Sequence, residues 1–500
     1  AVTGSAVDTL EVDIAVIGSG AAGLTAALTA SVLGLNVLLC EKEGQVGGTT
    51  ATSGGSCWVP LSRQARQRNV DDSPERVLAY LESEVGTPDT DGRRRAFVDG
   101  APRAFEFVEA NSALQFALPE VYPDYHPAQP GAALGGRTLQ PVPFDGRRLG
   151  AAFAIVRRPN RGQTVLGGLM VNRPEARLLV RPLASWRAFA FTARTMARFA
   201  VDRLRYPRGT RLLLGNAMVG ALLFTLRERG VPVWTSTAMQ SLLVEQGRVA
   251  GAVVAREGRT MVVRARRGVV LATGGFTSNE TLRRELGPDF PAAWALSATG
   301  ANGDGLSAAR AIGAAIDTSG AAPMFFMPAS VLRPGSSPPF AFPHIIADRA
   351  RPGLIAVDPK GRRFVNEADS YHDFVVAMYR SGIDRAYLVC DSRSLRTYGV
   401  GLIRPVWQWL SWYERAGYIV RGPTLAVLAQ RIGVPAESLT ATLAAYNDDA
   451  QRGVDSAFGK GDTALNRFNG DPAVKPNPCL ASIEAPPFIA VEVRPAAIGA

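Results

Sequence analysis

Cysteine and histidine are scarce in this chain of 500 residues, which contains 4 and 3 of them, respectively. The cysteines lie far apart without C-x-x-C spacing, so neither a zinc site nor a disulfide framework is expected, and a reducing compartment is indicated. The histidines are too dispersed for an obvious metal site, and we expect no bound metal. These residues are Cys40, Cys57, Cys390 and Cys479, and His126, His344 and His372.

Long apolar runs are also absent from the sequence. No uninterrupted apolar stretch is long enough to span a bilayer, and residues 1–13 lack the charged start and the apolar core of a secretion signal. We therefore expect a cytoplasmic protein. The composition, 47% hydrophobic and 20% charged, is typical of globular proteins, and the length allows two domains with full cores.

Acidic residues are fewer than basic ones, and the formal net charge is +11. No nucleic-acid recognition motif accompanies this charge, so we expect no nucleic-acid partner. The two open alternatives are a solvated basic face and peripheral contact with an anionic membrane, which would be the inner face of the cytoplasmic membrane.

Two stretches favour the membrane alternative. Residues 180–230 interleave arginines with aromatic residues, and within them residues 212–226 are nearly devoid of charge. Residues 393–425 are rich in Trp and Tyr, which suit a membrane interface. For the first stretch the alternative is a core helix with a solvated basic face, and for the second it is packing in the protein core or against a partner. The aromatic residues of the second stretch are Trp407, Trp409, Trp412, Tyr413 and Tyr418.

Near its N-terminus the sequence has a strand–glycine–helix–strand pattern. Val12–Ile17 is a short apolar run, which predicts a buried parallel strand. Gly18, Gly20 and Gly23 then form G-x-G-x-x-G, which allows a tight turn, the approach of a pyrophosphate to the backbone and close packing of the next helix. A second predicted strand ends at Glu41, whose carboxylate can accept the hydroxyls of an adenosine ribose. This order predicts a dinucleotide site, with a ligand-free strand–helix turn as the alternative.

The residues that follow indicate which dinucleotide is bound. A nicotinamide enzyme would normally continue into another helix, whereas this chain has a Gly/Ser/Thr-rich loop that suits a pyrophosphate, a ribityl chain and a flavin ring. A later strand also ends in small residues that can approach a cofactor closely. We therefore expect non-covalent FAD. The residues expected to hold it are Gly18, Ser19, Gly20, Ala21, Ala22, Gly23, Glu41, Lys42, Gly48, Thr49, Thr50, Ser53, Gly54, Gly55, Ala238, Thr273, Gly274 and Asp304.

The rest of the chain indicates a large FAD-binding domain and a second domain. Residues 75–110 have a helical pattern, and residues 231–273 return to strands, with a hairpin around Gly247. The amino-acid composition becomes Pro-rich and apolar from about residue 323, as expected of a domain that lines an apolar cleft. The expected division is 1–321 for the FAD-binding domain with a helical insertion at about 60–230, 322–483 for the catalytic or substrate domain, and 484–500 for a return to the FAD-binding domain.

The candidate catalytic groups are tyrosines. Residues 121–130 contain three prolines and cannot form a helix, so they predict a stiff loop that presents Tyr122, Tyr125 and His126. Tyr371 stands beside a predicted helix much farther along the chain. For the loop tyrosines, a packing role at the surface is the alternative.

Together these motifs resemble the bacterial 3-ketosteroid Δ1-dehydrogenases of the fumarate reductase/succinate dehydrogenase flavoprotein superfamily, over nearly the whole chain. The motifs general to FAD enzymes are GSGAAGLTAAL, EKEGQVGGTTATSGGSCWVP and RARRGVVLATGGF. The more specific ones are YPDYHPAQPGAALGGRTLQPVPFDGRRLG and GRRFVNEADSYHDFVVAMY. The resemblance implies an α/β fold, with a Rossmann-type FAD-binding domain and an inserted α+β substrate (cap) domain.

The resemblance also implies roles for individual residues. Tyr371 falls where the family has its general base, and Tyr125 falls where a second tyrosine assists it, with Tyr122 as the less favoured alternative. In the family, a third tyrosine and a glycine N–H bind the C3 carbonyl of the steroid. Their motif belongs to a C-terminal segment that would begin near Ala500, so we expect either that this sequence is truncated or that the enzyme is incomplete.

The chemistry of desaturation agrees with these roles. Forming a C–C double bond beside a ketone removes an acidic α-proton and a β-hydride, and a flavin can accept the hydride. Because the ordinary pKa of tyrosine is about 10, a tyrosine base needs a partner hydroxyl or a solvent relay. A fumarate reductase would instead need cationic clamps for its dicarboxylate, and no such His- and Arg-rich site is visible.

The sequence therefore predicts FAD-dependent 1,2-desaturation of 3-keto-4-ene steroids, with electrons passed to an acceptor that the sequence does not identify. The apolar second domain favours a steroid that keeps its side chain, such as cholest-4-en-3-one. The alternatives are a related dehydrogenase that acts at C4–C5 and a non-catalytic, flavin-holding docking subunit.

Overall fold

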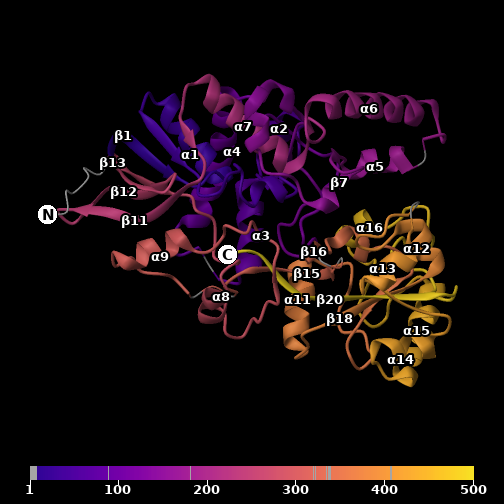
Figure 1. Ribbon diagram of the computed structural model, residues 1–500. Coiled ribbons are helices and arrows are strands. Elements are labelled where there is room, and N and C mark those ends of the chain that lie inside the picture. Colours follow the sequence, from indigo (N-terminus) through magenta and orange to yellow (C-terminus); the bar gives the residue numbers. More distant parts are fainter. Residues whose placement is uncertain are drawn as a thin grey trace.

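The computed structural model describes residues 8–87, 89–180, 182–318, 320, 322–333, 335, 339–405 and 408–500. Two units lie side by side, each built around its own sheet (Figure 1). Chain-terminal strand β20 and the helices drawn in orange to yellow form one unit, and the indigo to magenta elements form the other.

The first sheet has the strand order β10-β2-β1-β13-β12-β11. Strand β1 lies parallel to both β2 and β13, whereas β11, β12 and β13 form an antiparallel meander. The predicted first strand, its following helix α1 (Ala21–Val32) and the predicted hairpin are confirmed. The strands are β1 (Asp8–Ile17), β2 (Val37–Cys40), β10 (Val233–Trp234), β11 (Thr237–Glu245), β12 (Arg248–Arg256) and β13 (Arg259–Leu271).

A segment of helices and short strands separates β2 from β10. Its elements are η1 (Thr50–Thr52), β3 (Cys57–Trp58), α2 (Arg63–Gln67), α3 (Pro74–Val85), α4 (Arg93–Asn111), β4 (Phe116–Ala117), β5 (Thr138–Pro141), β6 (Phe144–Asp145), η2 (Gly146–Ile155), η3 (Arg161–Gln163), β7 (Thr164–Val165), β8 (Leu169–Met170), α5 (Arg173–Val180), α6 (Trp186–Arg205), β9 (Arg211–Leu212) and α7 (Leu214–Glu228).

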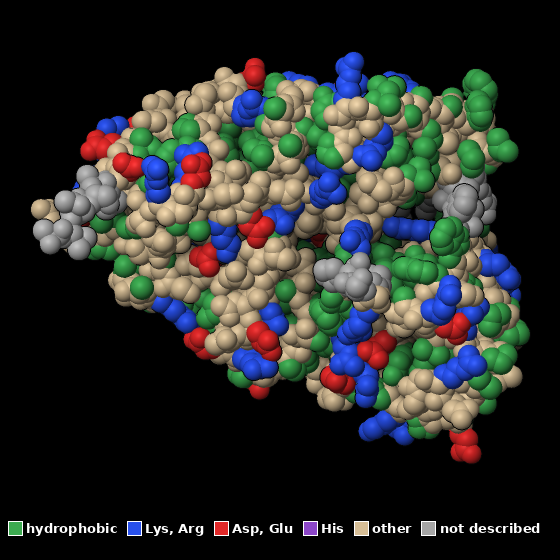
Figure 2. All heavy atoms as spheres, in the orientation of Figure 1, with side chains coloured by type: hydrophobic (Ala, Val, Ile, Leu, Met, Phe, Trp, Pro, Cys, Tyr) green, Lys and Arg blue, Asp and Glu red, His purple; other side chains and the backbone are tan. Residues whose placement is uncertain are grey.

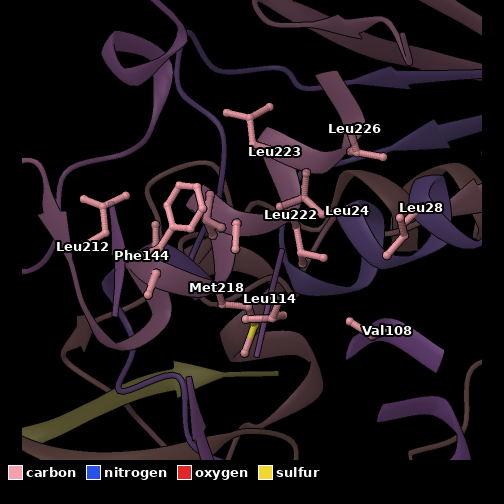
Figure 3. Packing of buried hydrophobic residues seen from close by; sticks show 14 of the residues in the cluster. Leu24, Leu28, Val108, Leu114, Phe144, Leu212, Met218, Leu222, Leu223 and Leu226 are labelled. Carbon is pink, nitrogen blue, oxygen red and sulfur yellow. The ribbon is translucent and has the colours of Figure 1, made fainter. Parts of the chain in front are cut away.

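Helix α7 is a core helix and does not lie on a surface. Leu222, Leu223 and Leu226 are each at most 1% exposed, and they pack with Leu24 and Leu28 of α1 in one hydrophobic cluster (Figure 3). The low charge of residues 212–226 therefore reflects burial on nearly every side of the helix, and the membrane alternative is wrong for this segment.

The second unit contains a sheet with the order β16-β15-β20-β18-β17, and β14 and β19 also pair with β20. Its strands, with β14 from the connecting segment, are β14 (Trp294–Ala295), β15 (Phe325–Leu332), β16 (Phe340–Pro343), β17 (Leu354–Val357), β18 (Ala386–Asp391), β19 (Val420–Gly422) and β20 (Phe488–Gly499). The helices after β13 are α8 (Glu280–Leu286), α9 (Asp304–Ala311), α10 (Ile346–Arg349), α11 (Tyr371–Arg380), α12 (Ser392–Tyr398), α13 (Leu410–Arg415), α14 (Leu425–Ile432), α15 (Ala436–Arg452) and α16 (Ala464–Asn469).

The placement of β20 differs from the expectation that residues 484–500 return to the first unit. The strand lies between β15 and β18, in the middle of the second sheet, and Ile489, Val491 and Val493 are completely buried there. Its last residues do contact segments assigned to the first domain: Ala496 and Ala497 pair with β14, and the Ala500 carbonyl oxygen is 2.5 Å from the position that a Cβ on Gly275 would take. The other domain boundaries stay predictions.

Exposed apolar side chains gather on α6 and the segment before it. Leu183, Trp186 and Leu204 are 87%, 79% and 84% exposed, and hydrophobic side chains cover this corner of the molecule at the upper right of Figure 2. Within the described residues, no helix combines the length and apolarity that crossing a membrane would require.

The Trp- and Tyr-rich stretch divides into exposed and buried members. Trp409 and Trp412 are 69% and 41% exposed. Tyr418, in contrast, is buried and its hydroxyl lies 2.8 Å from Ser330 Oγ. Tyr413 is half-buried, and Trp407 lies outside the described residues.

Candidate active site

The ends of three parallel strands meet at one edge of the first sheet. The Gly18 N–H donates to the Cys40 carbonyl at 2.7 Å, and the Ala272 N–H donates to the Ile17 carbonyl at 2.8 Å. The predicted cofactor residues that follow these strands are thereby brought together, as expected for parallel strands whose carboxyl ends share an edge. Thr273 and Gly274 belong to this group because they follow β13 directly.

The three glycines of the first turn have the geometry that the motif predicts. Gly18 has φ +103°, and a Cβ on Gly23 would lie 1.9 Å from the Gly18 carbonyl oxygen, so helix and strand are in close contact there. At Gly20 the nearest atom to a Cβ would be Thr50 Oγ1, at 3.6 Å, which leaves open space in front of the N-terminus of α1.

Hydrogen bonds from Ser19 and Glu43 hold the Glu41 carboxylate in one orientation. Its side chain accepts hydrogen bonds from the Ser19 N–H at 3.1 Å, from the Ser19 hydroxyl, and from the Glu43 N–H at 2.9 Å. The residue is only 8% exposed. A carboxylate has about four lone-pair sites, so it keeps capacity for a ribose hydroxyl. Ala238 lies beside it, because the N–H of the preceding Thr237 donates to the Glu41 carbonyl.

The Gly/Ser/Thr loop lines the same edge. The Thr50 side chain accepts from the Ala21 N–H at 2.9 Å, and the Thr49 side chain accepts from the Ala298 N–H at 3.0 Å. A Cβ on Gly48, Gly54 or Gly274 would meet nothing within 4 Å. This backbone cradle of N–H groups, hydroxyls and free space fits the phosphates and flavin of FAD. Ala22 and Gly55 flank it, and Gly55 N donates to Ser53 Oγ at 3.0 Å.

Lys42 and Asp304 close the edge from two distant parts of the chain. Lys42 Nζ lies 2.5 Å from Asp304 Oδ2, and Asp304 is the first residue of α9. A Cβ on the next residue, Gly305, would lie 2.3 Å from Thr273 Oγ1, so α9 packs directly on the end of β13. The predicted cofactor residues thus lie around one edge, and their individual contacts with FAD stay predictions.

Tyr125 and Tyr371 meet although they are far apart in the sequence. Their hydroxyl oxygens are 3.4 Å apart, and their rings make an edge-to-face contact with centroids 5.6 Å apart. Both rings pack against an apolar cluster that includes Ile346 and Leu465. Burial raises the pKa of Tyr125 well above its usual value, and the nearby Tyr371 adds to this rise. Tyr122 lies against Phe468, with ring centroids 5.7 Å apart.

The tyrosines line a cavity of ≈ 380 Å³. Among the described residues, its lining contains neither Lys nor Arg, so it offers neither of these cations to an anionic ligand. The lining residues are Ser56, Trp58, Tyr80, Leu81, Glu84, Tyr122, Pro123, Asp124, Tyr125, His126, Thr138, Phe325, Ser370, Tyr371, His372 and Asp373.

A buried arginine fixes the loop that carries Tyr125, and sequence reasoning missed it. Arg137 is completely buried and donates to Asp72 at 2.7 and 2.8 Å, to Asp124 at 2.8 Å and to the Gly131 carbonyl at 2.8 Å. Asp124 also accepts from the Trp58 indole N–H at 2.8 Å. Arg137 therefore holds the loop on both sides of Tyr125, at Asp124 and at Gly131. A single arginine within a Gly/Pro-rich loop was the only available signal.

A second buried arginine holds the segment that leads into Tyr371. Arg349 is completely buried, and its guanidinium donates to the backbone carbonyls of His344, Glu367 and Asp369. Burial lowers the pKa of Arg349 to about 10, so the group is still charged at neutral pH. Tyr371 therefore follows a segment whose backbone is fixed.

Two histidines of the cavity are in opposite electrostatic environments. His126 lies between two carboxylates, and hydrogen bonds to Asp373 and Glu84 raise its pKa to about 10. His372 accepts a hydrogen bond at Nδ1 from the Phe326 N–H, and burial lowers its pKa. At neutral pH the first is an imidazolium and the second is neutral.

A model of the FAD-binding domain family matches residues 13–500. The chain is 36% identical over 508 residues to the 3-oxosteroid 1-dehydrogenase of Mycobacterium tuberculosis (strain ATCC 25618 / H37Rv), covering 98% of this chain and 87% of that protein. It is also 36% identical over 501 residues to the 4-oxocyclohex-2-ene-1-carboxylate 5-dehydrogenase of Sinomonas cyclohexanicum, covering 98% and 84%.

Among solved structures, the chain resembles the 3-ketosteroid Δ1-dehydrogenase of Sterolibacterium denitrificans in complex with 1,4-androstadiene-3,17-dione. The TM-score is 0.89 at 36% identity, and the match covers 98% of this chain and 88% of that one. The matches confirm the α/β fold, FAD as the cofactor and an oxidoreductase activity. The chain belongs to the family of FAD-binding oxidoreductases that includes the 3-oxosteroid 1-dehydrogenases.

Proposed function

We propose that this protein is a 3-ketosteroid 1-dehydrogenase, which introduces the C1–C2 double bond into 3-keto-4-ene steroids. The observation that carries the proposal is the contact between the Tyr125 and Tyr371 hydroxyls, 3.4 Å apart in the wall of a cavity without lysine or arginine in its described lining. Relatives with this activity in their names align over nearly the whole chain.

In this proposal the two tyrosines have different roles. Tyr125, whose pKa is raised well above the usual value by burial, stays protonated and donates a hydrogen bond toward Tyr371. Such a bond stabilises a tyrosinate, so Tyr371 is the group that takes the α-proton of the steroid. FAD, bound at the edge of the first sheet, would supply the hydride acceptor. The roles of Tyr122 and of the cofactor residues named above remain part of the proposal.

A cyclohexenone carboxylate is the second candidate substrate, because the relative from Sinomonas cyclohexanicum is named for one. A carboxylate needs a cationic partner when it leaves water. The cation that lines the cavity is His126, and both of its ring nitrogens already face carboxylates at 2.7 Å. The cavity therefore favours the uncharged steroid. Higher kcat/KM for 4-oxocyclohex-2-ene-1-carboxylate than for androst-4-ene-3,17-dione would reverse this choice.

A steroid that keeps its side chain is the finer form of the proposal. Residues 323–328 are all apolar, and they contribute Phe325 to the cavity lining. Because Phe325 is 65% exposed, a long apolar substituent of the steroid could be covered by its ring. Comparable or faster turnover of cholest-4-en-3-one relative to androst-4-ene-3,17-dione is expected. A strong preference for the smaller steroid would contradict this part.

Peripheral membrane association is a further part of the proposal. Trp186 and Leu204 of α6 are exposed, and the chain carries a formal charge of +11. Exposed apolar side chains with nearby cations bind anionic lipid surfaces. The protein is expected to cosediment with anionic vesicles at low salt, and the double variant Trp186→Ser/Leu204→Ser is expected not to. Sedimentation of neither protein would contradict this part.

The Tyr371→Phe variant tests the proposed reaction itself. Loss of the base is expected to lower kcat by about 10²- to 10⁴-fold, with FAD retained. The ultraviolet spectrum of the product separates a 1,4-dien-3-one from the product of dehydrogenation at C4–C5. A wild-type protein that holds FAD and turns over no steroid would instead support a docking subunit.

A further inference from the structure

We infer that His126 is a positioning residue, which joins Glu84 and Asp373 into a clamp that holds Tyr125 against Tyr371. The inference rests on the proposed function, in which these two tyrosines are the proton-transfer pair. In this inference, His126 contacts neither of the two tyrosine hydroxyls but fixes their position relative to each other.

The clamp runs beside the contact between the tyrosines. His126 directly follows Tyr125 in the loop, and Asp373 lies two residues after Tyr371 in the first turn of α11. His126 Nε2 lies 2.7 Å from Asp373 Oδ2. The bond therefore joins the same two segments as the Tyr125–Tyr371 contact, one residue and two residues away from it.

The other arm of the clamp reaches α3 in the first unit. His126 Nδ1 lies 2.7 Å from both Glu84 oxygens, and the His126 backbone N–H donates to the Tyr80 hydroxyl at 3.4 Å. Since α3 belongs to the helical insertion and α11 to the second unit, one imidazole ring connects the two units at the cavity.

Asp373 is itself fixed by the start of its helix. The Ser370 hydroxyl donates to Asp373 Oδ2 at 2.6 Å, and the Asp373 N–H donates to Ser370 Oγ at 3.2 Å, which is an N-cap with a reciprocal bond. Tyr371 is the first residue of this helix. A displacement of Asp373 would therefore move the first turn of α11, which sets the orientation of the Tyr371 ring.

Both arms of the clamp require the charged imidazole. A neutral ring has one N–H and can donate to only one of the two carboxylates. The titratable groups that face His126 are Glu84 and Tyr80 on α3, Asp373 and His372 on α11, and Asp369 before it. Burial alone would raise the pKa of Asp373, but hydrogen bonds from His126 and Ser370 lower it below its usual value, so the pair is ionised at neutral pH.

Positioning and simple electrostatics predict different results for two substitutions. If the cluster acted only through its field, His126→Gln would remove a positive charge and raise the tyrosine pKa, whereas Asp373→Asn would remove a negative charge and lower it. For a clamp, His126→Gln removes both arms and Asp373→Asn weakens the arm to α11, so both changes loosen the connection between the two tyrosine segments. Both variants should then lower kcat in the same direction.

The experiment compares His126→Gln, Asp373→Asn and the double variant by steady-state kinetics with a 3-keto-4-ene steroid across pH. Each single change is expected to lower kcat by about 10- to 100-fold, as for misplaced catalytic groups, with KM for the steroid and FAD content little changed. The double variant should be no slower than the slower single variant, because both changes act on the contact between His126 and Asp373. Glu245→Gln, which removes a carboxylate from an exposed ion pair with Arg264, is the matched control and should keep the wild-type kcat.

A second measurement does not depend on turnover. The chain has 3 histidines, so the imidazole ¹⁵N–¹H correlations of the holoenzyme can be assigned by substitution. The His126 ring is expected to titrate near pH 10 in the wild type and at least about one unit lower in Asp373→Asn. A His126 ring that titrates at its ordinary value of about 6.5 would overturn the clamp even if the enzyme is inactive.

The two measurements separate the clamp from the proposed function. Wild-type turnover with an unchanged kcat in His126→Gln would overturn the clamp alone, and so would opposite shifts of the pH profile in the two single variants. Absence of steroid turnover in the wild type, together with a His126 ring that titrates near pH 10, would overturn the proposed function alone.

Discussion

At the scale of single residues, the two cavity tyrosines are chemically unequal. Burial raises the pKa of Tyr125 well above its usual value, and the adjacent Tyr371 contributes to this rise. Two phenolates at this distance would repel each other, so at most one of the two tyrosines gives up its proton at a time. In the proposed reaction, Tyr125 therefore remains a hydrogen-bond donor while Tyr371 exchanges protons.

We predict that Tyr125→Phe lowers kcat by about 10- to 100-fold, because the tyrosinate form of Tyr371 loses its donor. The pH above which kcat reaches its plateau should rise for the same reason. A pH profile of kcat measures both effects. An unchanged pH profile together with wild-type kcat would show that Tyr125 does not assist the base.

Arg137 stabilises the fold, and it also fixes the loop that carries Tyr125, a residue of the proposed catalytic pair. It is completely buried between Asp72 and Asp124, whose side chains are 3% and 2% exposed. Replacing Arg137 with Met leaves two carboxylates buried without their cation, which costs about 3–5 kcal/mol in the free energy of unfolding. Urea denaturation of the FAD-bound protein measures this loss.

Arg147→Met is the matched control for this prediction, because its ion pair with Asp145 is 45% exposed on the arginine side. A surface pair of this kind contributes about 1 kcal/mol or less. Equal denaturation midpoints for the two variants would contradict the structural role assigned to Arg137.

At the scale of elements, Gly23 in the first turn of α1 has no room for an added atom, whereas Gly54 in the neighbouring loop does. A Cβ on Gly23 would lie 1.9 Å from the Gly18 carbonyl oxygen, but a Cβ on Gly54 would meet nothing within 4 Å. The first glycine is therefore needed for the packing of α1 on the sheet, and the second leaves space at the predicted flavin site.

We predict that Gly23→Ala prevents accumulation of folded protein, because strand and helix must separate. Gly54→Ala should fold normally and bind FAD about 10-fold or more weakly, because the new methyl group enters the predicted cofactor space. Circular dichroism and flavin fluorescence titration measure the two outcomes. Normal FAD affinity in Gly54→Ala would place the cofactor elsewhere along the loop.

Local elements were the most predictable part of this fold. The glycine turn, the hairpin around Gly247 and the strand ending before Glu41 each depend on neighbours in the sequence, so pattern and spacing suffice. The contact between Tyr125 and Tyr371 joins residues 246 positions apart, and only the family resemblance pointed to it.

The features that the sequence did not predict depend on contacts between residues far apart in the chain. Strand β20 is apolar like any buried strand, and nothing in its residues says that it lies between β15 and β18. The partners of Arg137 and His126 likewise come from helices and loops far away in the chain. Conversely, the low charge of α7 fits both a membrane surface and a core, and its burial decides for the core.

At the scale of the whole molecule, the clamp at His126 links stability to pH. Its pKa is about 10 in the folded protein, above the value of about 6.5 expected after unfolding. A raised pKa means that the stabilisation is fully present below about pH 6.5 and is lost as the pH rises toward 10.

We predict that the melting temperature of the wild type falls more steeply between about pH 7 and pH 10 than that of His126→Gln. Thermal denaturation at several pH values measures the two slopes, and groups that titrate in both proteins cancel in the comparison. Parallel curves would mean that His126 contributes no pH-dependent stability.

The central claim is that this chain removes hydrogen from a 3-keto-4-ene steroid with FAD as the acceptor. The direct measurement is anaerobic mixing of the FAD-bound protein with androst-4-ene-3,17-dione while the flavin absorption is recorded. We predict bleaching of the flavin with formation of one equivalent of 1,4-dien-3-one, and much slower bleaching in Tyr371→Phe. A flavin that stays oxidised with androst-4-ene-3,17-dione and with cholest-4-en-3-one would contradict the account.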